Sequence, residues 1–179
     1  MKKFIYLIIF LSGLGIIACQ KKIVEPIDLT QNITIGNFDD YVVFGYVGIG
    51  WGCRTNVIYL ISDGKLYADT SKIFCKTQDK YQFSGYQLPD NEYNKAAIVF
   101  QTLPVELSKQ DSKTFGCPGC ADGGMLFMQR KEKGKTLKSW RIDDAIFRSK
   151  NDTNNEPFPE YLHNYAKDFS TLINRLKYK

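Results

Sequence analysis

The C-terminal segment from residue 159 carries one apolar stripe at helical spacing, and this stripe limits what the rest of the chain can form. Its apolar side chains recur three or four positions apart, with one adjacent pair. The stripe consists of Leu162, Tyr165, Phe169, Leu172, Ile173 and Leu176. Pro159 suits a first helical turn, and Arg175, Lys177 and Lys179 lie where cations favour the helix dipole. A helix with a single apolar face has to cover another apolar surface, which the chain must supply.

Strand patterns upstream predict such a surface. Residues 40–50 (DYVVFGYVGIG) are rich in β-branched and aromatic side chains, and residues 57–61 (VIYLI) form a short continuous apolar run. Asp63 and Gly64 follow, and Leu66 then opens another apolar run. An Asp-Gly pair between two such runs is the strongest short-range signal for a β-hairpin.

A second hairpin and one further strand are predicted downstream. Residues 125–130 (MLFMQR) lead through KEKGK into residues 136–142 (TLKSWRI), and Gly134 supplies the positive φ that the turn requires. Residues 96–103 (AAIVFQTL) are predicted to form another strand, closed by Pro104. These patterns predict an α+β fold in which an antiparallel sheet built from hairpins packs against the C-terminal helix. A small β-sandwich or barrel with an accessory helix is the alternative.

The N-terminus indicates export and lipid anchoring. Lys2 and Lys3 precede an apolar stretch that ends in Ile-Ile-Ala-Cys at Cys19, the pattern of a lipoprotein signal peptide with its lipobox. This stretch is too short for a comfortable membrane span of ~20 residues. We therefore expect residues 1–18 to be a signal peptide and Cys19 to be acylated, with acyl chains that anchor the protein in the bilayer. Gln20 is typical of lipoproteins that reach the outer membrane.

The predicted mature chain divides into a tether and one domain. Residues 19–37 mix charged and amide side chains with proline, as a spacer between bilayer and domain does. Residues 38–179 are long enough for a single disulfide-stapled domain with its own core. Loss of Lys2 and Lys3 with the signal peptide lowers the 24 basic side chains to 22, against 19 acidic ones. This balance is too mild for a nucleic-acid binder, so the expected partners are the bilayer, through Cys19, and an unknown protein or anionic envelope component.

Candidate catalytic groups are sparse, and we predict no catalytic residue, no metal site and no cofactor. His163 is the single histidine, and the helical register places it off the apolar stripe, at a solvated position. Asp39 and Asp40 are adjacent, as are Asp143 and Asp144. Neighbouring residues of a strand point to opposite faces, which argues against a glycosidase-like acid pair at either place.

The second hairpin is strongly basic. Six cations flank or occupy its turn, against Glu132 alone. They are Arg130, Lys131, Lys133, Lys135, Lys138 and Arg141. Such a patch is able to meet lipid headgroups or an acidic partner. The alternative is a solvated hairpin whose charges keep it soluble and protect its edges from pairing, and we favour this alternative.

Four cysteines follow Cys19, and disulfides are the default for an even set in an exported chain. If the first hairpin turns at residues 63–64, its register places Cys53 within one residue of Cys75. We therefore expect one bridge between Cys53 and Cys75. The remaining Cys117 and Cys120 would then form a tight local ring.

The Cys-Pro-Gly-Cys segment has two other interpretations. A redox dithiol needs its first cysteine at a helix N-terminus, which lowers the thiol pKa, whereas here glycines and a strand follow. A zinc site of four cysteines normally shows two close pairs, whereas Cys53 and Cys75 are far apart in sequence. A structural staple with Pro118 and Gly119 in its turn is the favoured interpretation.

Three segments carry a family resemblance. They are residues 103–129 (LPVELSKQDSKTFGCPGCADGGMLFMQ), 139–144 (SWRIDD) and 158–176 (FPEYLHNYAKDFSTLINRL). They resemble a group of small bacteroidete-type lipoproteins with a Cys-Pro-x-Cys-Ala-Asp-x-Gly signature and a C-terminal Pro-x-Tyr-Leu helix. The resemblance implies an envelope location and this architecture, but no reaction. Relatives are often acidic where this chain has Gly119, which argues against a ligand role for that position.

These observations lead to three functional hypotheses. The first is a membrane-anchored envelope lipoprotein that acts as a non-enzymatic binding or structural module. The second is a periplasmic thiol-disulfide oxidoreductase that uses Cys117 and Cys120. The third is an inhibitor or capture module for a secreted enzyme.

Overall fold

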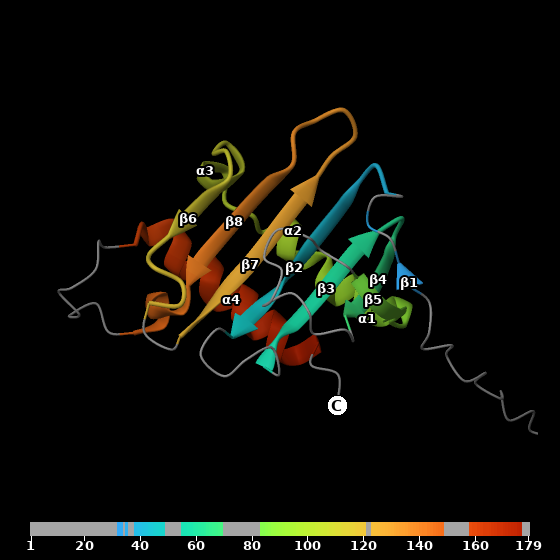
Figure 1. Ribbon diagram of the computed structural model, residues 1–179, viewed down its shortest axis with the longest axis horizontal. Helices are drawn as coiled ribbons and strands as arrows, with labels where there is room; N and C mark the ends of the chain where they lie inside the picture. The colour runs from blue at the N-terminus through green and yellow to red at the C-terminus, as the bar shows by residue number, and fades with distance from the viewer. Residues whose placement is uncertain are drawn as a thin grey trace, which may run out of the picture.

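The computed structural model describes most of the chain between Asn32 and Leu176, which forms an α+β fold. The described residues are 32–33, 35, 38–48, 55–69, 83–120, 123–148 and 158–176. Helices pack on an open mixed sheet with the strand order β1-β5-β4-β3-β2-β7-β8-β6 (Figure 1). The strands are β1 (Asn32–Ile33), β2 (Tyr41–Gly48), β3 (Val57–Ser62), β4 (Lys65–Asp69), β5 (Phe83–Gln87), β6 (Lys113–Phe115), β7 (Gly124–Lys131) and β8 (Lys138–Asp143). The helices are α1 (Asp90–Ala96), α2 (Ile98–Gln101), α3 (Val105–Ser108), the 3-10 helix η3 (Asp144–Phe147) and α4 (Glu160–Leu176).

Both predicted hairpins are confirmed. β3 and β4 pair antiparallel with Ile61 opposite Leu66, and Asp63 (φ 50°) and Gly64 (φ 71°) form the turn. Positive φ at both central positions gives the turn a twist that matches that of the flanking strands. β7 and β8 pair in the same antiparallel way, and Gly134 between them has a φ of 71°.

The predicted antiparallel sheet is confirmed, except that one edge pair is parallel and makes the sheet mixed. β6 pairs parallel with β8, with Thr114 opposite Arg141. The chain reverses twice between these strands, once into β7 and once into β8, so β6 and β8 run in the same direction (Figure 1). The sheet is open, with β1 and β6 as its outer strands, so the alternative of a sandwich or barrel is also wrong.

Residues 96–103 form helix rather than the predicted strand. α1 ends at Ala96 and α2 covers Ile98–Gln101. Val99 is 1% exposed while Ile98 is 46% exposed, so the run buries one helical face. Short apolar runs fit a buried helix as well as a strand, and here the helix forms. Pro104 precedes α3 as its N-cap residue.

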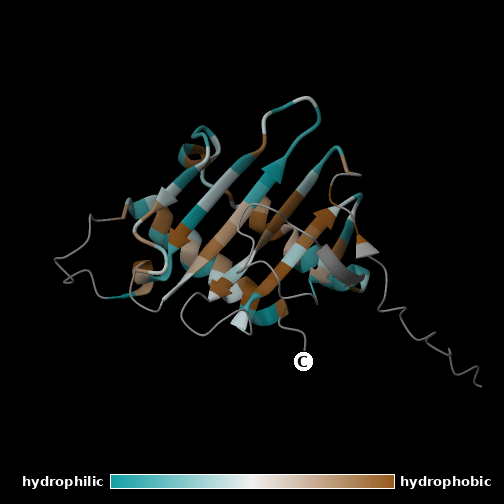
Figure 2. Cartoon of the chain, in the orientation of Figure 1, coloured by the Kyte–Doolittle hydropathy of each residue, from teal (hydrophilic) through white to brown (hydrophobic). Residues whose placement is uncertain are grey.

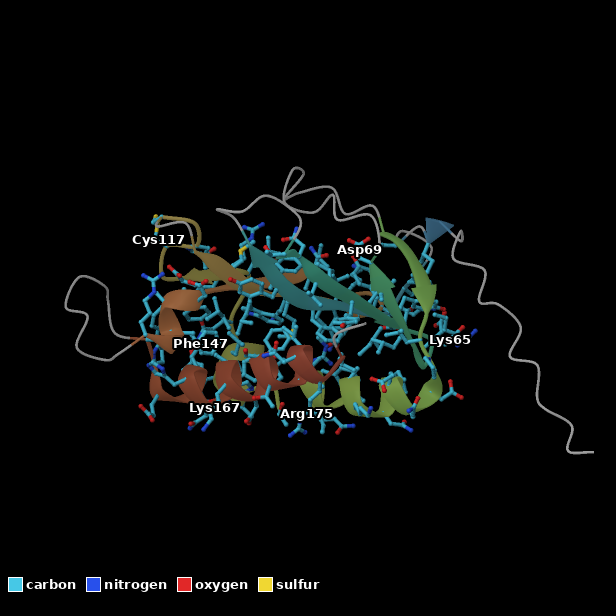
Figure 3. The ribbon with its side chains drawn as sticks, turned by 90° about the horizontal axis from the view of Figure 1, so that it is seen from below. Lys65, Asp69, Cys117, Phe147, Lys167 and Arg175 are labelled. Carbon is cyan, nitrogen blue, oxygen red and sulfur yellow. A yellow bond between two sulfur atoms is a disulfide. The ribbon has the colours of Figure 1, made fainter. Side chains whose placement is uncertain are left out.

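The C-terminal helix is confirmed. All six members of the predicted stripe are buried on α4. Phe169 packs against Phe44 of β2, with ring centroids 6.0 Å apart, and against Tyr165 at 5.6 Å. The Tyr165 hydroxyl donates to the Val99 carbonyl at 3.1 Å, which ties α4 to α2. Figure 3 shows the helices below the sheet, with Lys167 on the outer side of α4. Full burial of each large apolar side chain stabilises the fold by about 1.5–3 kcal/mol.

The opposite face of the sheet is also apolar. The buried cluster there consists of Ile35, Val43, Val47, Ile58, Leu60, Met125 and Phe127. Ile33 and Phe38 pack against this cluster, and β1 pairs with β5. The described fold therefore begins before Phe38, whereas residues up to 37 were expected to belong to the tether. Hydropathy colouring shows apolar residues along the middle strands and a polar tip on the β7–β8 hairpin (Figure 2).

Candidate functional site

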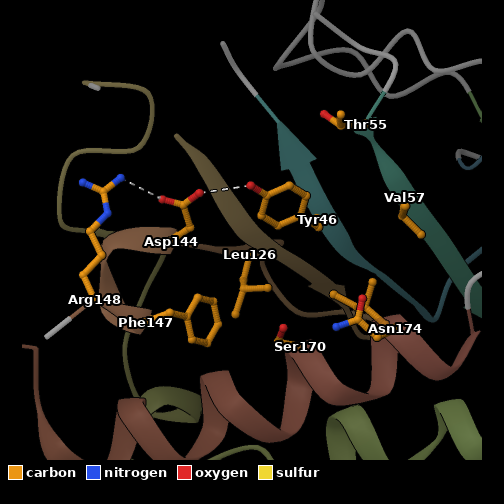
Figure 4. A pocket seen from close by; sticks show the side chains of 10 residues that line it. Tyr46, Thr55, Val57, Leu126, Asp144, Phe147, Arg148, Ser170 and Asn174 are labelled. Atoms are coloured by element: carbon orange, nitrogen blue, oxygen red, sulfur yellow. Dashed lines mark hydrogen bonds and ion pairs between the residues drawn. The ribbon is translucent and has the colours of Figure 1, made fainter. Parts of the chain in front are cut away.

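A pocket of about 560 Å³ lies between α4 and the helix-facing side of the sheet, near the end of β8. Its lining combines apolar walls with several polar side chains (Figure 4). The lining residues are Tyr46, Thr55, Val57, Leu126, Asp144, Phe147, Arg148, Ser170, Ile173 and Asn174. This volume lies within the range of small-molecule sites.

Strand register forms the sheet wall of the pocket. Tyr46 of β2 lies directly opposite Val57 of β3 and Leu126 of β7. Residues opposite one another in neighbouring strands present their side chains on the same face, so these three side chains line the pocket side by side. Leu126 is 1% exposed and extends the apolar core into the pocket.

The helix wall comes from one face of α4. Ser170, Ile173 and Asn174 lie three and four positions apart, which places them on one side of the helix. Ile173 is 3% exposed, so it belongs to the core, while Ser170 is half-buried and Asn174 is exposed. The pocket therefore has an apolar floor and a polar edge.

Asp144 holds the end of the sheet wall together. Its Oδ2 accepts a hydrogen bond from the Tyr46 hydroxyl at 3.0 Å and from the Gly124 amide at 2.6 Å. Its Oδ1 lies 3.7 Å from Arg148 Nη2. A Cβ on Gly123 would lie 2.8 Å from Oδ1, so a larger residue there would displace the Asp144 carboxylate.

The Tyr46 hydroxyl stays protonated over a wide pH range. Burial, and then the hydrogen bond and charge of Asp144, raise its pKa to about 12. Both effects disfavour the tyrosinate form. At neutral pH Tyr46 is therefore a hydrogen-bond donor to Asp144 and not a base.

Asp143, which is 7% exposed, ties the disulfide loop to η3. Its Oδ1 accepts from the Ala145 amide at 2.9 Å, which caps η3, and its Oδ2 accepts from the Cys117 amide at 2.8 Å. Gly116 has a φ of 75°, and a side chain there would meet Asp143. We call Asp143 and Asp144 with these donor groups the aspartate corner.

The structural role of the aspartate corner was not predicted from the sequence. Both carboxylates were expected in a strand, whereas the strand ends at Asp143 and η3 begins at Asp144. The two carboxylates do contact different parts of the molecule. Asp143 accepts from the amides of Cys117 and Ala145, and Asp144 accepts from the amide of Gly124. The sequence did contain one indication of this role. Aspartate is a common N-cap residue, and Asp143 lies at the end of a predicted strand, two positions before the Ala145 amide that it caps.

Cys117 and Cys120 form a disulfide, as predicted, with their Cα atoms 5.5 Å apart. The Cys120 amide donates to the Cys117 carbonyl at 3.0 Å, and Gly119 has a φ of 84°. This is the tight Pro-Gly turn that the sequence predicted. Both cysteines are exposed, and the loop lies at the far end of the molecule from Lys65 (Figure 3). Cys19, Cys53 and Cys75 lie outside the described residues.

The basic hairpin has acidic partners close by. Glu132 binds both Arg130, at 2.9 Å, and Lys135. Lys133 forms an ion pair with Asp39 at 3.0 Å. Exposed ion pairs stabilise a fold little, but these pairs reduce the net positive charge of the hairpin tip.

The other basic residues of the hairpin also have interaction partners. Lys138 donates to the carbonyls of Ser108 and Gln110, at 3.0 Å each, and so fastens the segment after α3 to β8. Lys131 donates to the Lys135 carbonyl, and Arg141 also has an interaction partner. This arrangement favours the solvated hairpin over a site for anionic partners.

His163 lies apart from the pocket lining. It is half-buried, and its ring meets the edge of Phe158 at 6.0 Å. The helical register predicted a solvated position for His163, and the packing against Phe158 explains why it is partly buried.

In the part of the chain that the structure describes, no group of three or more His, Cys, Asp or Glu side chains is arranged to hold a metal ion. None of the helices described combines the length and hydrophobicity that a membrane span requires. No protein-family model matches this chain, and no curated protein sequence or solved structure shows significant similarity to it.

Proposed function

We propose that this protein is a lipid-anchored envelope protein that acts as a non-enzymatic binding module, with the pocket between α4 and the sheet as its ligand site. The lipid anchor is supported by the lipobox that ends at Cys19 and by the resemblance to small lipoproteins. The outer membrane is the proposed location because Gln20, rather than aspartate, follows the cysteine.

The shape and chemistry of the pocket carry the binding proposal. Small-molecule sites are mostly apolar clefts with a few convergent polar groups. This pocket has apolar walls from Leu126 and Ile173, and polar groups from Tyr46, Ser170 and Asn174. Its walls belong to β2, β7 and α4, so the site is formed before a ligand arrives.

Binding suits the polar groups better than catalysis does. The Tyr46 hydroxyl and the Oδ2 atom of Asp144 already bond to each other, and Asp144 also accepts from the Gly124 amide. A general base needs a pKa near the working pH and a free acceptor. Tyr46, with a pKa of about 12, lies far from that range.

Filling the pocket tests the binding proposal. Ser170→Phe places a ring in the pocket, whereas Thr171→Phe places it at an exposed position on the same helix. The probe is N-phenyl-1-naphthylamine, a neutral apolar dye that fluoresces on burial. Wild type and Thr171→Phe should enhance its fluorescence, and Ser170→Phe should not. Equal enhancement in all three proteins contradicts the proposal.

Lipidation is tested separately. Cys19→Ala removes the acyl acceptor, so the variant should lose labelled palmitate and leave the membrane fraction. Palmitate incorporation equal to that of wild type would show that Cys19 is not the anchor.

A thiol-disulfide oxidoreductase is the second candidate, favoured by the exposed Cys117–Cys120 disulfide. The surroundings do not favour a stable thiolate. The Asp143 carboxylate accepts from the Cys117 amide at 2.8 Å, which places a negative charge beside the cysteine. A nearby like charge disfavours an anion. The protein should therefore fail to catalyse insulin reduction by dithiothreitol, and catalysis that Cys117→Ser abolishes would favour this candidate instead.

A further inference from the structure

Among the described residues that line the pocket, two are charged, and the more accessible charge is positive. The Arg148 side chain is 49% exposed, whereas that of Asp144 is 20% exposed. Asp144 Oδ1 is buried and makes no hydrogen bond, and Oδ2 already accepts from Tyr46 and Gly124. A ligand in the pocket therefore meets the guanidinium of Arg148 and not the carboxylate.

The guanidinium keeps hydrogen-bonding capacity for a ligand. Its contact with Asp144 Oδ1 is 3.7 Å long, which is an ion pair but not a hydrogen bond. Arginine presents several N–H donors in a planar fork that matches a carboxylate. Asp144 offsets part of the positive charge, so the site suits a ligand with a single negative charge.

An apolar surface lies directly beside this cation. Phe147 precedes Arg148 in the chain, lines the pocket and is 48% exposed, which is unusual for so large an apolar side chain. Leu126 and Ile173 also line the pocket, and Figure 4 shows Leu126 close to Phe147. A ligand with an apolar body would cover Phe147 and fill the floor.

We propose that the pocket binds a small amphipathic monocarboxylate, with its carboxylate on Arg148 and its apolar body against Phe147, Leu126 and Ile173. This inference rests on the proposed binding function of the same pocket. The inference excludes a cationic ligand. Such a ligand would need the Asp144 carboxylate, but Oδ2 already accepts two hydrogen bonds and Oδ1 is buried.

Three probes with one common body test the inference by isothermal titration calorimetry on the full chain. They are 4-phenylbutyrate, 4-phenylbutan-1-ol and 4-phenylbutan-1-amine, which carry a negative, neutral and positive head. The carboxylate should bind about tenfold more tightly than the alcohol, since a hydrogen bond to a charged group stabilises a complex to that extent. The amine should bind most weakly.

Two arginine variants provide the controls. Arg148→Gln should lower the affinity for the carboxylate to that for the alcohol and leave the alcohol unchanged, which also shows that the pocket remains folded. Arg175→Gln changes an exposed arginine of α4 outside the pocket lining and should alter nothing.

The outcomes separate this inference from the proposed function. Equal affinity for carboxylate and alcohol, or a carboxylate preference that survives in Arg148→Gln, overturns the inference. If Ser170→Phe still abolishes binding in that case, the pocket remains a ligand site. Failure of all three probes to bind, or binding that Ser170→Phe does not change, overturns both.

Discussion

The interface between α4 and the sheet and the aspartate corner are held together by different forces. The interface buries Leu162, Tyr165 and Phe169 in one apolar cluster with side chains of β2, β3, β4, β6, β7 and β8 and of the short helices α1, α2 and α3. The corner buries little apolar surface and depends on two carboxylates, Asp143 and Asp144, that accept backbone amides. The stabilisation from apolar packing is shared among many side-chain contacts. In the corner, by contrast, it depends on a few hydrogen bonds between specific carboxylate oxygens and specific amides.

This difference bears on the pocket, which takes a wall from each region. Ile173 and Leu126 belong to the apolar interface, while Asp144 and Arg148 belong to the corner or lie beside it. In the proposed site, the apolar wall would provide general affinity for a ligand body, and the corner would position Arg148, which would select its charge. Substitutions in the two regions should therefore lower the stability of the fold by different amounts, and the losses should depend differently on pH.

The largest effect should follow disruption of the interface. Phe169→Asp places a charge at a position that is 2% exposed, and an unpaired buried charge costs about 3–5 kcal/mol. Lys167→Asp, on the exposed side of α4, should change stability by less than about 0.5 kcal/mol. Urea unfolding of both variants measures the difference, and equal midpoints would mean that α4 does not dock on the sheet.

A smaller loss should follow removal of one acceptor from the corner. Asp143→Ala leaves the amides of Cys117 and Ala145 without their partner, which costs about 1–3 kcal/mol. Asp143→Asn keeps an acceptor and should lose less. Asp111→Ala, at an exposed position, serves as the control in the same unfolding assay. A loss no greater than that of the control would show that the corner does not support the fold.

Opening the disulfide loop should cost less again. The ring between Cys117 and Cys120 is short, and a bridge stabilises by limiting the unfolded chain, so replacing both cysteines with Ser should cost about 1–2 kcal/mol. The predicted Cys53–Cys75 bridge closes a longer loop, and replacing that pair should cost more. The reverse order of the two losses would contradict this account of the staple.

The last effect is the share of the alkaline pH dependence that Tyr46 contributes. The pKa of Tyr46 is raised to about 12 in the folded protein, so Tyr46 stabilises the fold fully below pH 10 and loses this contribution as pH rises through 12. The stability difference between wild type and Tyr46→Phe should therefore shrink from pH 10 to 12. The difference between wild type and the interface variant Leu172→Val should stay constant. A Tyr46→Phe difference that is also constant would show that the hydroxyl does not titrate with folding.

The same contrast explains which parts of the structure the sequence could predict. Hairpins and an amphipathic helix are local patterns, and the turns at Gly64 and Gly134 and the stripe on α4 were predicted correctly. Residues 96–103 were predicted wrongly as a strand because a short apolar run is compatible with both a buried strand and a buried helix. The parallel edge strand β6 depends on how the chain crosses the fold, which no local pattern records.

The pocket was not predictable from the sequence for a related reason. Its lining joins Tyr46, Leu126, Asp144 and Ser170, which are distant in the chain and become neighbours only through strand register and helix docking. The cysteine turn, by contrast, lies within four residues and was predicted. Chemistry built from neighbours in sequence can be predicted, whereas chemistry assembled by the fold needs the structure.

The most direct test of the central claim is a map of where a ligand binds. Amide chemical shifts of the full chain, recorded by NMR during titration with 4-phenylbutyrate, should change most around Tyr46, Leu126, Phe147 and Ser170. Changes that centre instead on Val43, Leu60 and other residues of the opposite sheet face, or no saturable change at all, would contradict a ligand site between α4 and the sheet.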